Sequence, residues 1–316
     1  MTTVIIGAGL AGLTAARVLQ GKDVILLDKG KSAGGRLATR RIGNGKADHG
    51  AQFFTVRTKE LQSAAEDWLK SGLIKKWFGD HHPRYIGVNG MNSIAKYLAE
   101  GLDVRTDTEA IKVSETEKGY RIDCRNGEVF TAEYLLITAP APQAAALLEA
   151  GGIKDTEELK NIVFNPCYTA MLTLKEAQSV NQEGHLQSDL PEGIERIADQ
   201  SRKGISKEPI VSVYTTGKWA KQHENLEAEE VLKKMLFLVK EIVPADLIEE
   251  VQLKRWRYAE AEKPYPQSYL ELEKKVPLLV AGDAFLRSDD SAGKTRFESA
   301  YISGLDAGER LLEIMR

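Results

Sequence analysis

The sequence predicts an α/β protein, in which a Rossmann-like domain with a parallel sheet and helices is combined with a smaller, mixed α+β domain. Two observations support this prediction. The first 28 residues contain a strand, a glycine-rich turn, a helix and a second strand, which together form a βαβ unit. Residues 276–316 return to the same strand-then-helix pattern after a middle region of short strands and polar loops. Both chain ends are therefore expected in one domain, with the second domain inserted between its parts.

The composition is that of an ordinary globular protein and argues against several classes. The chain has 316 residues, about twice a typical domain length. Its 43 basic and 46 acidic residues give a net charge of −3, which argues against nucleic acid or an anionic membrane as the main partner. Two cysteines without C-x-x-C spacing disfavour a disulfide framework, a zinc cluster and dithiol chemistry. No apolar run reaches membrane-spanning length and the first residues lack a signal-peptide pattern, so we expect a cytoplasmic protein.

The βαβ unit at the start of the chain is the clearest element. Residues 4–6 are β-branched and end at a glycine, which predicts a buried strand. Residues 10–20 have helical spacing of apolar side chains, with Gly21 as the expected C-cap. Residues 24–27 predict a second strand that ends at Asp28. Because these strands are continuously apolar, we expect a parallel sheet that is covered on both faces.

The remaining elements follow from apolar periodicity and turn residues. Before the middle region we expect hairpin turns at 42–46 and 126–127, helices at 58–70 and 92–100, and strands at 110–114, 120–124 and 134–137. In the middle region we expect strands at 168–174 and 210–214 and an amphipathic helix at 232–243. Near the C-terminus we expect a strand at 276–281 and a helix at 297–315.

A glycine-rich motif follows the first predicted strand and opens the first predicted helix. The pattern G-x-G-x-x-G is formed by Gly7, Ala8, Gly9, Leu10, Ala11 and Gly12. In this context the first glycine permits a tight turn, the second lets the main chain approach a diphosphate, and the third lets helix and strand pack closely. Asp28 ends the second strand, where its carboxylate is expected to accept ribose hydroxyls, and the adjacent Lys29 is included in the predicted site. These features predict a bound dinucleotide.

A second glycine turn favours FAD as that dinucleotide. Gly34, Gly35 and Arg36 follow Asp28 by only a few positions. Such a turn suits a cofactor with an extended diphosphate and a ribityl chain. The guanidinium of Arg36 is always charged and is expected to pair with a phosphate.

The C-terminal motifs point to the same cofactor. Gly282 and Asp283 end the last predicted strand, where Asp283 is expected to accept a ribityl hydroxyl. Glu298, Ser299 and Ala300 begin the final helix, whose N-terminus is expected to face the N1/O2 edge of the flavin. We therefore predict an FAD-binding domain of residues 1–59, 84–148 and 276–316, and a substrate-binding domain of residues 60–83 and 149–275.

Five longer blocks carry a resemblance to a known family. They are GRLATRR at 35–41, DHGAQFFT at 48–55, GVNGM at 87–91, RWRYA at 255–259 and AGDAF at 281–285. Together with the glycine motif, they resemble the flavin-containing amine oxidase superfamily and, within it, the renalase-type branch. The similarity spans nearly the whole chain. The loop at 287–296 differs from the short turn with Arg-Val-Glu-Gly that many relatives have there.

The resemblance implies both a site and an activity. It places Gly50, Ala51, Gln52 and Phe53 against the isoalloxazine, adds Gly90 and Met91 to the cofactor site, and lets the inserted domain cover the substrate face. It implies hydride transfer to N5 of a non-covalent FAD and reoxidation by molecular oxygen, which gives hydrogen peroxide. The renalase-type substrate is an isomer of NAD(P)H reduced at the wrong ring carbon. Because the cofactor carries this chemistry, no catalytic side chain is assigned.

Candidate substrate-binding residues come from the middle region. A planar ring with phosphates suits a slot lined by aromatic and arginine side chains, which are Tyr214, Trp219, His223, Trp256, Arg257 and Tyr258. For each aromatic residue alone, packing in the core is the simpler interpretation. His81 and His82 are adjacent, so in a strand they point to opposite faces, and we predict no metal site.

Two other functions stay open at this stage. An oxidase of ordinary small amines favours an aromatic cage around the substrate nitrogen and needs few arginines for phosphate. An FAD-binding redox sensor needs no turnover at all. Either enzymatic function implies a small-molecule substrate.

Overall fold

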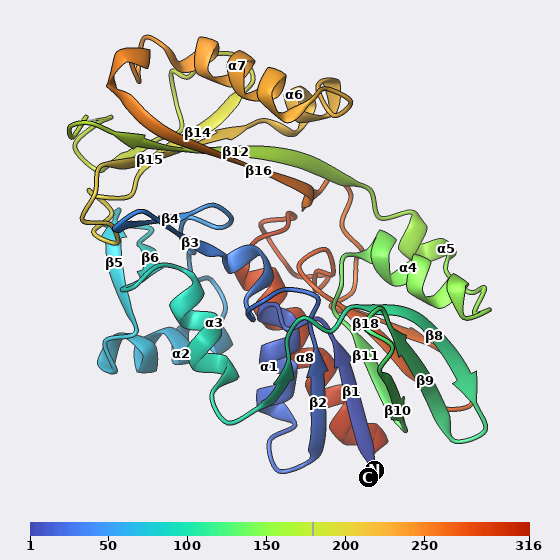
Figure 1. Ribbon diagram of the computed structural model, residues 1–316. Helices are drawn as coiled ribbons and strands as arrows, with labels where there is room; N and C mark the ends of the chain where they lie inside the picture. The colour runs from blue at the N-terminus through green and yellow to red at the C-terminus, as the bar shows by residue number, and fades with distance from the viewer. Residues whose placement is uncertain (179) are drawn as a thin grey trace.

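The structure, a computed structural model, describes residues 1–178 and 180–316 (Figure 1). The helices are α1 (Leu10–Val18), α2 (Lys59–Lys70), α3 (Asn92–Ala99), α4 (Ala141–Ala150), α5 (Glu157–Lys160), α6 (Gly217–Gln222), α7 (Ala228–Val239) and α8 (Phe297–Ile314), with short 3-10 helices at Gly35–Leu37 and Ala245–Leu247. The strands are β1 (Thr2–Ile6), β2 (Asp23–Leu27), β3 (Thr39–Ile42), β4 (Gly45–Asp48), β5 (Ile74–Phe78), β6 (Arg84–Gly87), β7 (Asp103–Arg105), β8 (Ala110–Thr116), β9 (Gly119–Cys124), β10 (Val129–Ala132), β11 (Tyr134–Ile137), β12 (Phe164–Leu174), β13 (His185–Leu186), β14 (Ile194–Asp199), β15 (Ile210–Thr215), β16 (Ile248–Ala261), β17 (Tyr269–Leu272) and β18 (Leu278–Ala281).

A six-stranded sheet forms the lower part of the molecule in Figure 1, in the order β17-β18-β11-β1-β2-β7. All of these strands except β17 are parallel, so their carboxyl ends meet at one edge. Ile5 packs in a core with α1, α3 and α8, whereas its neighbour Val4 packs in a second core with α4 and the antiparallel sheet β8–β10. The predicted Rossmann-like fold is confirmed, with a small sheet in place of some helices on one face.

The two ends of the chain meet through α1 and α8. A Cβ on Gly304 would lie 2.2 Å from the carbonyl oxygen of Ala11, and a Cβ on Gly308 would lie 3.1 Å from the Cα of Ala15. Because glycine removes these side chains, α8 packs directly on the backbone of α1. This contact holds the C-terminal segment beside the first βαβ unit.

A second sheet lies above the first in Figure 1, in the order β13-β14-β15-β12-β16, and all of its strand pairs are antiparallel. Helices α6 and α7 cover one face, and the other face is turned toward the first sheet (Figure 1). Along β12, Ala170 and Leu172 pack in the core with α7. The alternate residues Thr169 and Met171 instead contact the segment around β3 and β4. Strand alternation therefore decides which side chains of this sheet face the first domain.

Two segments of the predicted substrate-binding domain pack with the first sheet instead. Strand β17 pairs antiparallel with β18. Helix α2 buries Leu61, Ala65 and Trp68 in the core that also contains α1 and α8. The reason is burial, because the apolar faces of both segments pack in cores that contain elements of the first domain. The division into two domains remains a proposal.

Some predicted element ends are corrected. Helix α1 ends at Val18, and its C-cap is Leu19, so Gly21 lies in the following turn with a φ of +89°. Helix α7 ends at Val239, before the predicted end, and Val243 follows it into the same core. Apolar spacing continues past a helix wherever the connecting turn is itself buried.

The two cysteines and the histidine pair take no part in a shared site. Cys124 and Cys167 are buried free thiols in β9 and β12. His81 and His82 are exposed in the turn between β5 and β6 and not within a strand. Over residues 1–178 and 180–316, no group of His, Cys, Asp and Glu side chains is arranged to hold a metal ion. No helix of this described part has the length and apolar character needed to cross a bilayer.

Candidate functional site

The glycine turn, residues 7–12, joins β1 to α1 at the carboxyl edge of the six-stranded sheet. Gly7 has a φ of +109°, which side chains disfavour, and its N–H donates to the carbonyl of Leu27 at 2.7 Å. A Cβ on Gly12 would lie 2.0 Å from the oxygen of Gly7, so helix and strand require glycine here. A Cβ on Gly9 would meet no atom of the described residues within 4 Å. The main chain at Gly9 is therefore open to a ligand.

The N-terminus of α1 points its amides toward this open side. Helical hydrogen bonding begins with the N–H of Leu13, which donates to the carbonyl of Gly9 at 3.0 Å. The N–H groups of Leu10, Ala11 and Gly12 precede that bond and have no helical acceptor. Such amides, with the positive end of the helix dipole, form a binding site for a diphosphate.

Asp28 lies at the end of β2 beside the glycine turn. Its Oδ2 accepts the N–H of Ala8 at 2.8 Å, and its Oδ1 accepts the N–H of Gly30 at 2.7 Å. A carboxylate has about four acceptor positions, so ribose hydroxyls can bind to those that remain. Lys29 is turned to the surface, where its Nζ lies 3.2 Å from Oε1 of Gln143. The turn and Asp28 thus fit the adenosine diphosphate half of FAD.

The second glycine turn lies directly against the first. The N–H of Gly34 donates to the carbonyl of Ala8 at 2.8 Å, and a Cβ on Gly35 would lie 3.5 Å from the Cα of Gly9. Thr138, which the sequence did not single out, donates its hydroxyl to the carbonyl of Gly7 at 2.9 Å. The two predicted turns are therefore parts of one site.

Arg36 and Asp283 are brought together, but they bind each other. Nη1 and Nη2 of Arg36 donate to the two carboxylate oxygens of Asp283 at 2.7 and 2.5 Å. Nη1 also lies 3.1 Å from the carbonyls of Tyr258 and Ala259. The sequence predicted a phosphate and a ribityl hydroxyl as their respective partners. Arg36 thus joins the second glycine turn to β16 through the two carbonyls and to the residue pair after β18 through Asp283.

The end of β18 is fixed to α8 by serine hydroxyls. The N–H of Gly282 donates to Oγ of Ser303 at 2.8 Å, and Oγ of Ser299 donates to the carbonyl of Asp283 at 2.8 Å. Ala300 is half-buried in the first turn of the helix. The side chain of Ser299 is thus used to hold the strand end, and the main chain of α8 is what remains for a ligand.

Glu298 serves α2. It is 1% exposed, and its Oε1 accepts the N–H groups of Arg57 and Thr58, each at 2.7 Å. Its Oε2 accepts from Nη2 of Arg296 at 3.2 Å, and Arg296 in turn pairs with Asp290 at 2.7 Å. The loop at 287–296 is therefore held by ion pairs. The Glu298 side chain fixes the backbone just before α2, and the approach of the α8 N-terminus to the flavin edge stays a prediction.

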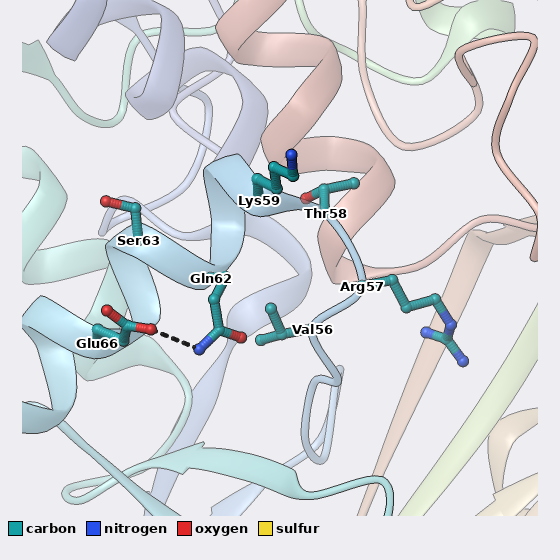
Figure 2. Close-up of a pocket in the computed structure, with 7 residues that line it drawn as sticks. All are labelled: Val56, Arg57, Thr58, Lys59, Gln62, Ser63 and Glu66. Atoms are coloured by element: carbon teal, nitrogen blue, oxygen red, sulfur yellow. Dashed lines mark hydrogen bonds between the residues drawn. The ribbon is translucent and has the colours of Figure 1, made fainter.

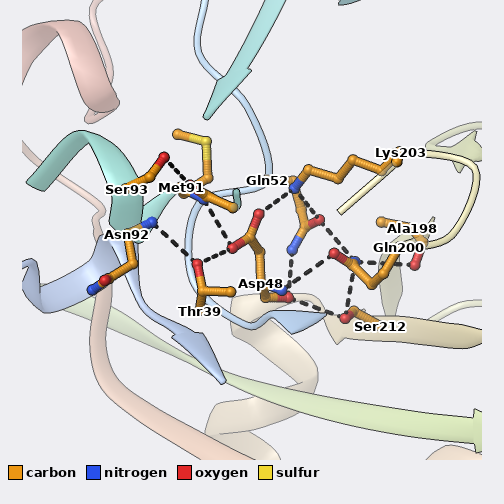
Figure 3. A network of polar contacts seen from close by, with 12 residues as sticks. Thr39, Asp48, Gln52, Met91, Asn92, Ser93, Ala198, Gln200, Lys203 and Ser212 are labelled. Carbon is orange, nitrogen blue, oxygen red and sulfur yellow. Dashed lines mark hydrogen bonds and ion pairs between the residues drawn. The ribbon is translucent and has the colours of Figure 1, made fainter. Parts of the chain in front are cut away.

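Behind residues 49–53 lies a buried polar network (Figure 3). Oδ2 of Asp48 accepts from Nζ of Lys203 at 2.6 Å, and both side chains are fully buried. Oε1 of Gln52 accepts from Lys203 and from Nε2 of Gln200, each at 3.0 Å. Burial lowers the pKa of Lys203, and the attraction of Asp48 opposes this effect. The ion pair joins the first domain to the loop after β14.

Strand β15 completes this network. The hydroxyls of Ser212 and Tyr214 donate to the carbonyl of Asp48 at 3.0 and 2.9 Å. Nε2 of Gln52 donates to the same carbonyl at 2.7 Å and also contacts the hydroxyl of Tyr214. The side chain of Gln52 is therefore used within this network, and its place against the isoalloxazine stays a prediction. The Asp48 network is formed by Asp48, Gln52, Gln200, Lys203, Ser212 and Tyr214.

Gly90 and Met91 support Asp48 from the other side. The N–H of Met91 donates to Oδ1 of Asp48 at 3.0 Å, and the hydroxyl of Thr39 donates to the same oxygen. Gly90 has a φ of +99°, and a Cβ there would lie 2.6 Å from Oγ1 of Thr39. Met91 is fully buried. The predicted cofactor residues Gly90 and Met91 thus position the segment before Gly50.

Phe53 leads from this segment into a cluster of rings. Its ring lies edge-on to Trp77, Phe78 and His185, with centroid separations of 6.3, 5.9 and 5.3 Å. The rings come from β5, from the start of β13 and from residues 49–53. With the two arginines that lie over these rings, we call this set the aromatic–cation cluster, which is formed by Phe53, Trp77, Phe78, Arg84, His185 and Arg196.

Cations surround these rings. The guanidinium carbons of Arg84 and Arg196 each lie 5.9 Å from the centre of the Phe53 ring. His185 is 7% exposed. Burial, and then the charges of Arg196, Lys203 and Arg84, lower the pKa of His185 to about 4. The imidazole is therefore neutral at pH 7, in a region of positive potential.

His49 and Trp256 form a second contact between the domains. Their rings stack with a centroid separation of 5.3 Å, and Nε1 of Trp256 donates to the carbonyl of His49 at 2.6 Å. Burial, followed by the charges of Lys254 and Arg40, lowers the pKa of His49 to about 4. Trp256 therefore reaches the face of the second sheet that meets residues 49–53, as does Tyr214.

Trp219 and His223 lie elsewhere, which corrects the predicted substrate set. Their rings stack at 3.9 Å on the side of α6, and Trp219 packs edge-on against Tyr168 in the core with α7. Helix α6, which carries Trp219 and ends just before His223, lies on the side of the second sheet away from β3 and β4 (Figure 1). Trp219 thus packs in the core, and His223 is half-buried beside it.

Arg257 and Tyr258 also differ from the predicted set. Arg257 is exposed, and strand alternation directs it to the face opposite Trp256. Tyr258 packs its ring edge-on against Phe164 at 5.8 Å and contributes its carbonyl to Arg36. Neighbouring residues of one strand cannot line one slot together.

Several residues of this region were missed by sequence reasoning. Asp48 stood in a quoted block without a role. A buried carboxylate needs a partner, but no local pattern identifies Lys203 as that partner. The same holds for Arg84, His185 and Arg196, which are isolated in sequence and meet only in the fold.

A separate surface pocket lies at the start of α2 (Figure 2). Within it, Nε2 of Gln62 donates to Oε1 of Glu66 at 2.8 Å. None of its residues belongs to the predicted site; they are Val56, Arg57, Thr58, Lys59, Gln62, Ser63 and Glu66.

Comparisons with known proteins agree with this arrangement. The family described as NAD(P)-binding Rossmann-like domain matches residues 5–68, and the family described as flavin containing amine oxidoreductase matches residues 71–312. Among solved structures, a protein from Exiguobacterium sp. 255-15 that is assigned as a protoporphyrinogen oxidase is similar in fold, with a TM-score of 0.69 and 15% identity over 99% of each chain. Since the amine oxidoreductase match spans more than half of the residues, this chain belongs to the flavin-containing amine oxidoreductase family and is an FAD-dependent oxidoreductase.

Proposed function

We propose that this protein is of the renalase type and oxidises isomers of NAD(P)H that are reduced at the wrong ring carbon, with molecular oxygen as the electron acceptor. The observation that carries the proposal is the positive, aromatic surroundings of Phe53, next to the segment that resembles the flavin-contacting block of the family. An anionic nucleotide with a planar ring matches both features.

The residues that would hold FAD follow from the geometry above. The glycine turn and the first amides of α1 bind the diphosphate, and Asp28 binds the adenosine ribose. The remaining contacts are assigned to the second glycine turn, to the main chain at residues 50–53 and to the ends of β18 and α8. Gly50 supports this assignment, because a Cβ there would lie 2.0 Å from the carbonyl of Arg36, so the segment packs directly on the second glycine turn.

The second sheet covers the substrate side. Tyr214 and Trp256 fasten it to residues 48 and 49 by hydrogen bonds to main-chain carbonyls. Such a cover excludes water from the reacting carbon and orients the substrate ring. No side chain is needed to remove a proton, because the hydrogen leaves the substrate as hydride.

The charges argue against an ordinary amine as substrate. An amine is a cation at pH 7, and an aromatic cage attracts it only where the rings are free of other cations. Here Arg84 and Arg196 already lie over the Phe53 ring. They repel an ammonium group and attract a phosphate, which favours the nucleotide.

When bound, FAD supplies the hydride acceptor at N5 and delivers the electrons to oxygen. In the overall balance, one dihydronicotinamide, one oxygen molecule and one proton give one oxidised nicotinamide and one hydrogen peroxide. The second sheet and residues 49–53 contribute by holding the donor carbon near the ring.

The test is an anaerobic titration of the FAD-loaded protein, followed by its visible spectrum. We expect the 2- and 6-dihydro isomers of NAD(P)H to bleach the flavin bands at one equivalent, and a primary aromatic amine and a polyamine to leave them unchanged. Readmission of oxygen is expected to restore the colour and to give one hydrogen peroxide per substrate. Bleaching by the amines alone would instead identify an amine oxidase, and no bleaching by any donor would indicate a redox sensor.

A further inference from the structure

Arg84 differs from the other cations near these rings, which are Arg196 of the aromatic–cation cluster and Lys203 of the Asp48 network. Arg196 pairs with Glu195 at 2.5 Å, and Lys203 pairs with Asp48 at 2.6 Å. Over residues 1–178 and 180–316, Arg84 has no carboxylate within ion-pair distance; its Nη1 donates to the carbonyl of His82 at 2.7 Å. Its Nε is buried and, among the described residues, has no hydrogen-bond partner. This cation therefore lacks both a counter-charge and an acceptor for Nε–H.

His185 has an unused polar atom in the same place. Its ring stacks on Phe78 with a centroid separation of 5.2 Å, and its Nε2 is buried without a partner in the described chain. A buried donor or acceptor without a partner is costly, so a missing ligand is the physical explanation that such an atom suggests. Two side chains from distant segments thus each carry an unpartnered polar atom near the rings of Phe53 and Phe78.

Arg84 and His185 lie close to residues 50–53, the segment predicted to contact the isoalloxazine. The guanidinium carbon of Arg84 lies 5.3 Å from the centre of the Phe78 ring and 5.9 Å from that of Phe53. Phe53 ends the segment at 50–53, and Phe53, Trp77 and Phe78 are each half-buried, so their outer sides reach solvent. A ligand that enters beside Phe53 therefore passes the free N–H groups of Arg84.

We propose that Arg84, with His185 beside it, binds a phosphate of the substrate and thereby makes this enzyme specific for nicotinamide nucleotides over nucleosides. The inference rests on the proposed function and adds to it a residue that determines specificity. The guanidinium is always charged and planar, and its N–H donors suit the oxygens of a phosphate. The neutral imidazole supplies a further hydrogen bond without a competing charge.

The first test measures binding to the FAD-loaded protein by calorimetry. Nicotinamide mononucleotide carries one phosphate and nicotinamide riboside carries none, so their affinity ratio isolates the phosphate. We expect the wild type to prefer the mononucleotide by about tenfold or more, which is about 1.4 kcal/mol. Arg84→Gln is expected to bind both compounds alike. Arg125→Gln, an exposed arginine paired with Glu109 on β8–β10, is the matched control and is expected to keep the preference.

A conservative variant separates charge from structure. Arg84→Lys keeps the charge but loses the planar fork, so we expect a preference at least threefold lower than that of the wild type. Equal affinities in the wild type, or an unchanged preference in Arg84→Gln or Arg84→Lys, overturn the proposal. If Arg84→Gln fails to fold, as judged by its melting curve and flavin spectrum, Arg84→Lys decides the question alone.

A second measurement distinguishes failure of this inference from failure of the proposed function. The flavin is titrated anaerobically with a dihydronicotinamide isomer in its riboside form, which has no phosphate. Bleaching by this compound without any phosphate preference in binding leaves the proposed function intact and rejects the role of Arg84. A phosphate preference that depends on Arg84, without bleaching by any isomer, supports the subsite and rejects the proposed reaction.

Discussion

The glycine turn and the Asp48 network solve the same problem, which is to hold a segment in front of a ligand, in opposite ways. The glycine turn uses six consecutive residues and main-chain atoms, and it works because side chains are absent. The Asp48 network uses side chains from β4, the loop after β14, and β15, and it works because every polar group has a partner. The glycine turn forms from residues that are neighbours in the sequence. The Asp48 network forms only when the two sheets pack together.

This difference predicts which substitutions disrupt the glycine turn and which disrupt the Asp48 network. The glycine turn fails to pack when a side chain is added at Gly12, because the nearest atom is a backbone oxygen that cannot move aside. The Asp48 network fails when any partner is removed, because a buried charge is then left without compensation. The following variants test this contrast.

The largest effect is expected for Gly12→Ala. Its Cβ would lie 2.0 Å from the oxygen of Gly7, so we expect no folded, FAD-loaded protein on purification. The matched variant is Gly9→Ala, whose Cβ meets no described atom within 4 Å. We expect Gly9→Ala to keep the melting temperature of the apoprotein but to bind FAD about tenfold more weakly or worse, because the methyl group occupies the diphosphate position.

The readouts are thermal melting of the apoprotein and FAD affinity from the visible spectrum. Normal FAD affinity in Gly9→Ala would show that the diphosphate does not approach this glycine. That result would contradict the distinction between Gly12, which packing requires, and Gly9, which the ligand requires.

The next effect is expected for Lys203→Met. Removal of one partner leaves Asp48 fully buried and unpaired, which costs about 3–5 kcal/mol of unfolding free energy. The double variant Asp48→Asn with Lys203→Met removes both charges and is expected to recover part of that loss. Urea denaturation of the single and double variants gives the coupling energy, and additive losses would contradict a direct ion pair.

The neutral histidines predict a loss of stability in acid. The pKa of His185 and of His49 is about 4 in the folded protein, whereas an unfolded histidine takes up its proton near pH 6.5. Between these values the unfolded chain binds more protons, so the unfolding free energy falls as the pH drops from 6.5 toward 4. The loss approaches about 3 kcal/mol for each histidine below pH 4.

Urea denaturation at a series of pH values between 4 and 7 measures this slope. His185→Gln is expected to reduce it, and His82→Gln, at an exposed position, is the control that leaves it unchanged. The same slope in His185→Gln as in the wild type would show that this imidazole is not held neutral by burial and its cationic neighbours.

The smallest loss of stability is expected for Glu298→Gln. This residue lies at the start of α8. Loss of the charge that accepts from the amides of Arg57 and Thr58 is expected to cost about 1.5–3 kcal/mol. The flavin reduction potential is expected to stay unchanged, since the side chain serves α2. A shifted potential at unchanged stability would restore the role at the flavin edge that the sequence suggested.

Much of the FAD site was predictable because its signals are local. The strand, glycine motif, helix and Asp28 lie within 28 residues, and each restricts the main chain directly. Hydrophobic periodicity likewise predicted α2, α3 and α8, four strands of the six-stranded sheet and two of the five strands of the second sheet. The substrate side was less predictable, since Trp219 and Trp256 are both aromatic residues of the middle region, and only the sheet decides that one faces α7 and the other His49.

The sequence by itself indicated the flavin-containing amine oxidoreductase family and FAD, and it predicted where the diphosphate binds, because backbone turns and strand ends depend on neighbouring residues. Only the tertiary structure decided that Arg36 meets Asp283, that Lys203 neutralises Asp48, and that Arg84 and His185 both lie near the ring of Phe78. The physical reason is that charges interact over a few ångströms of space. The residues around a charged side chain in the sequence therefore do not show which partner folding brings to it.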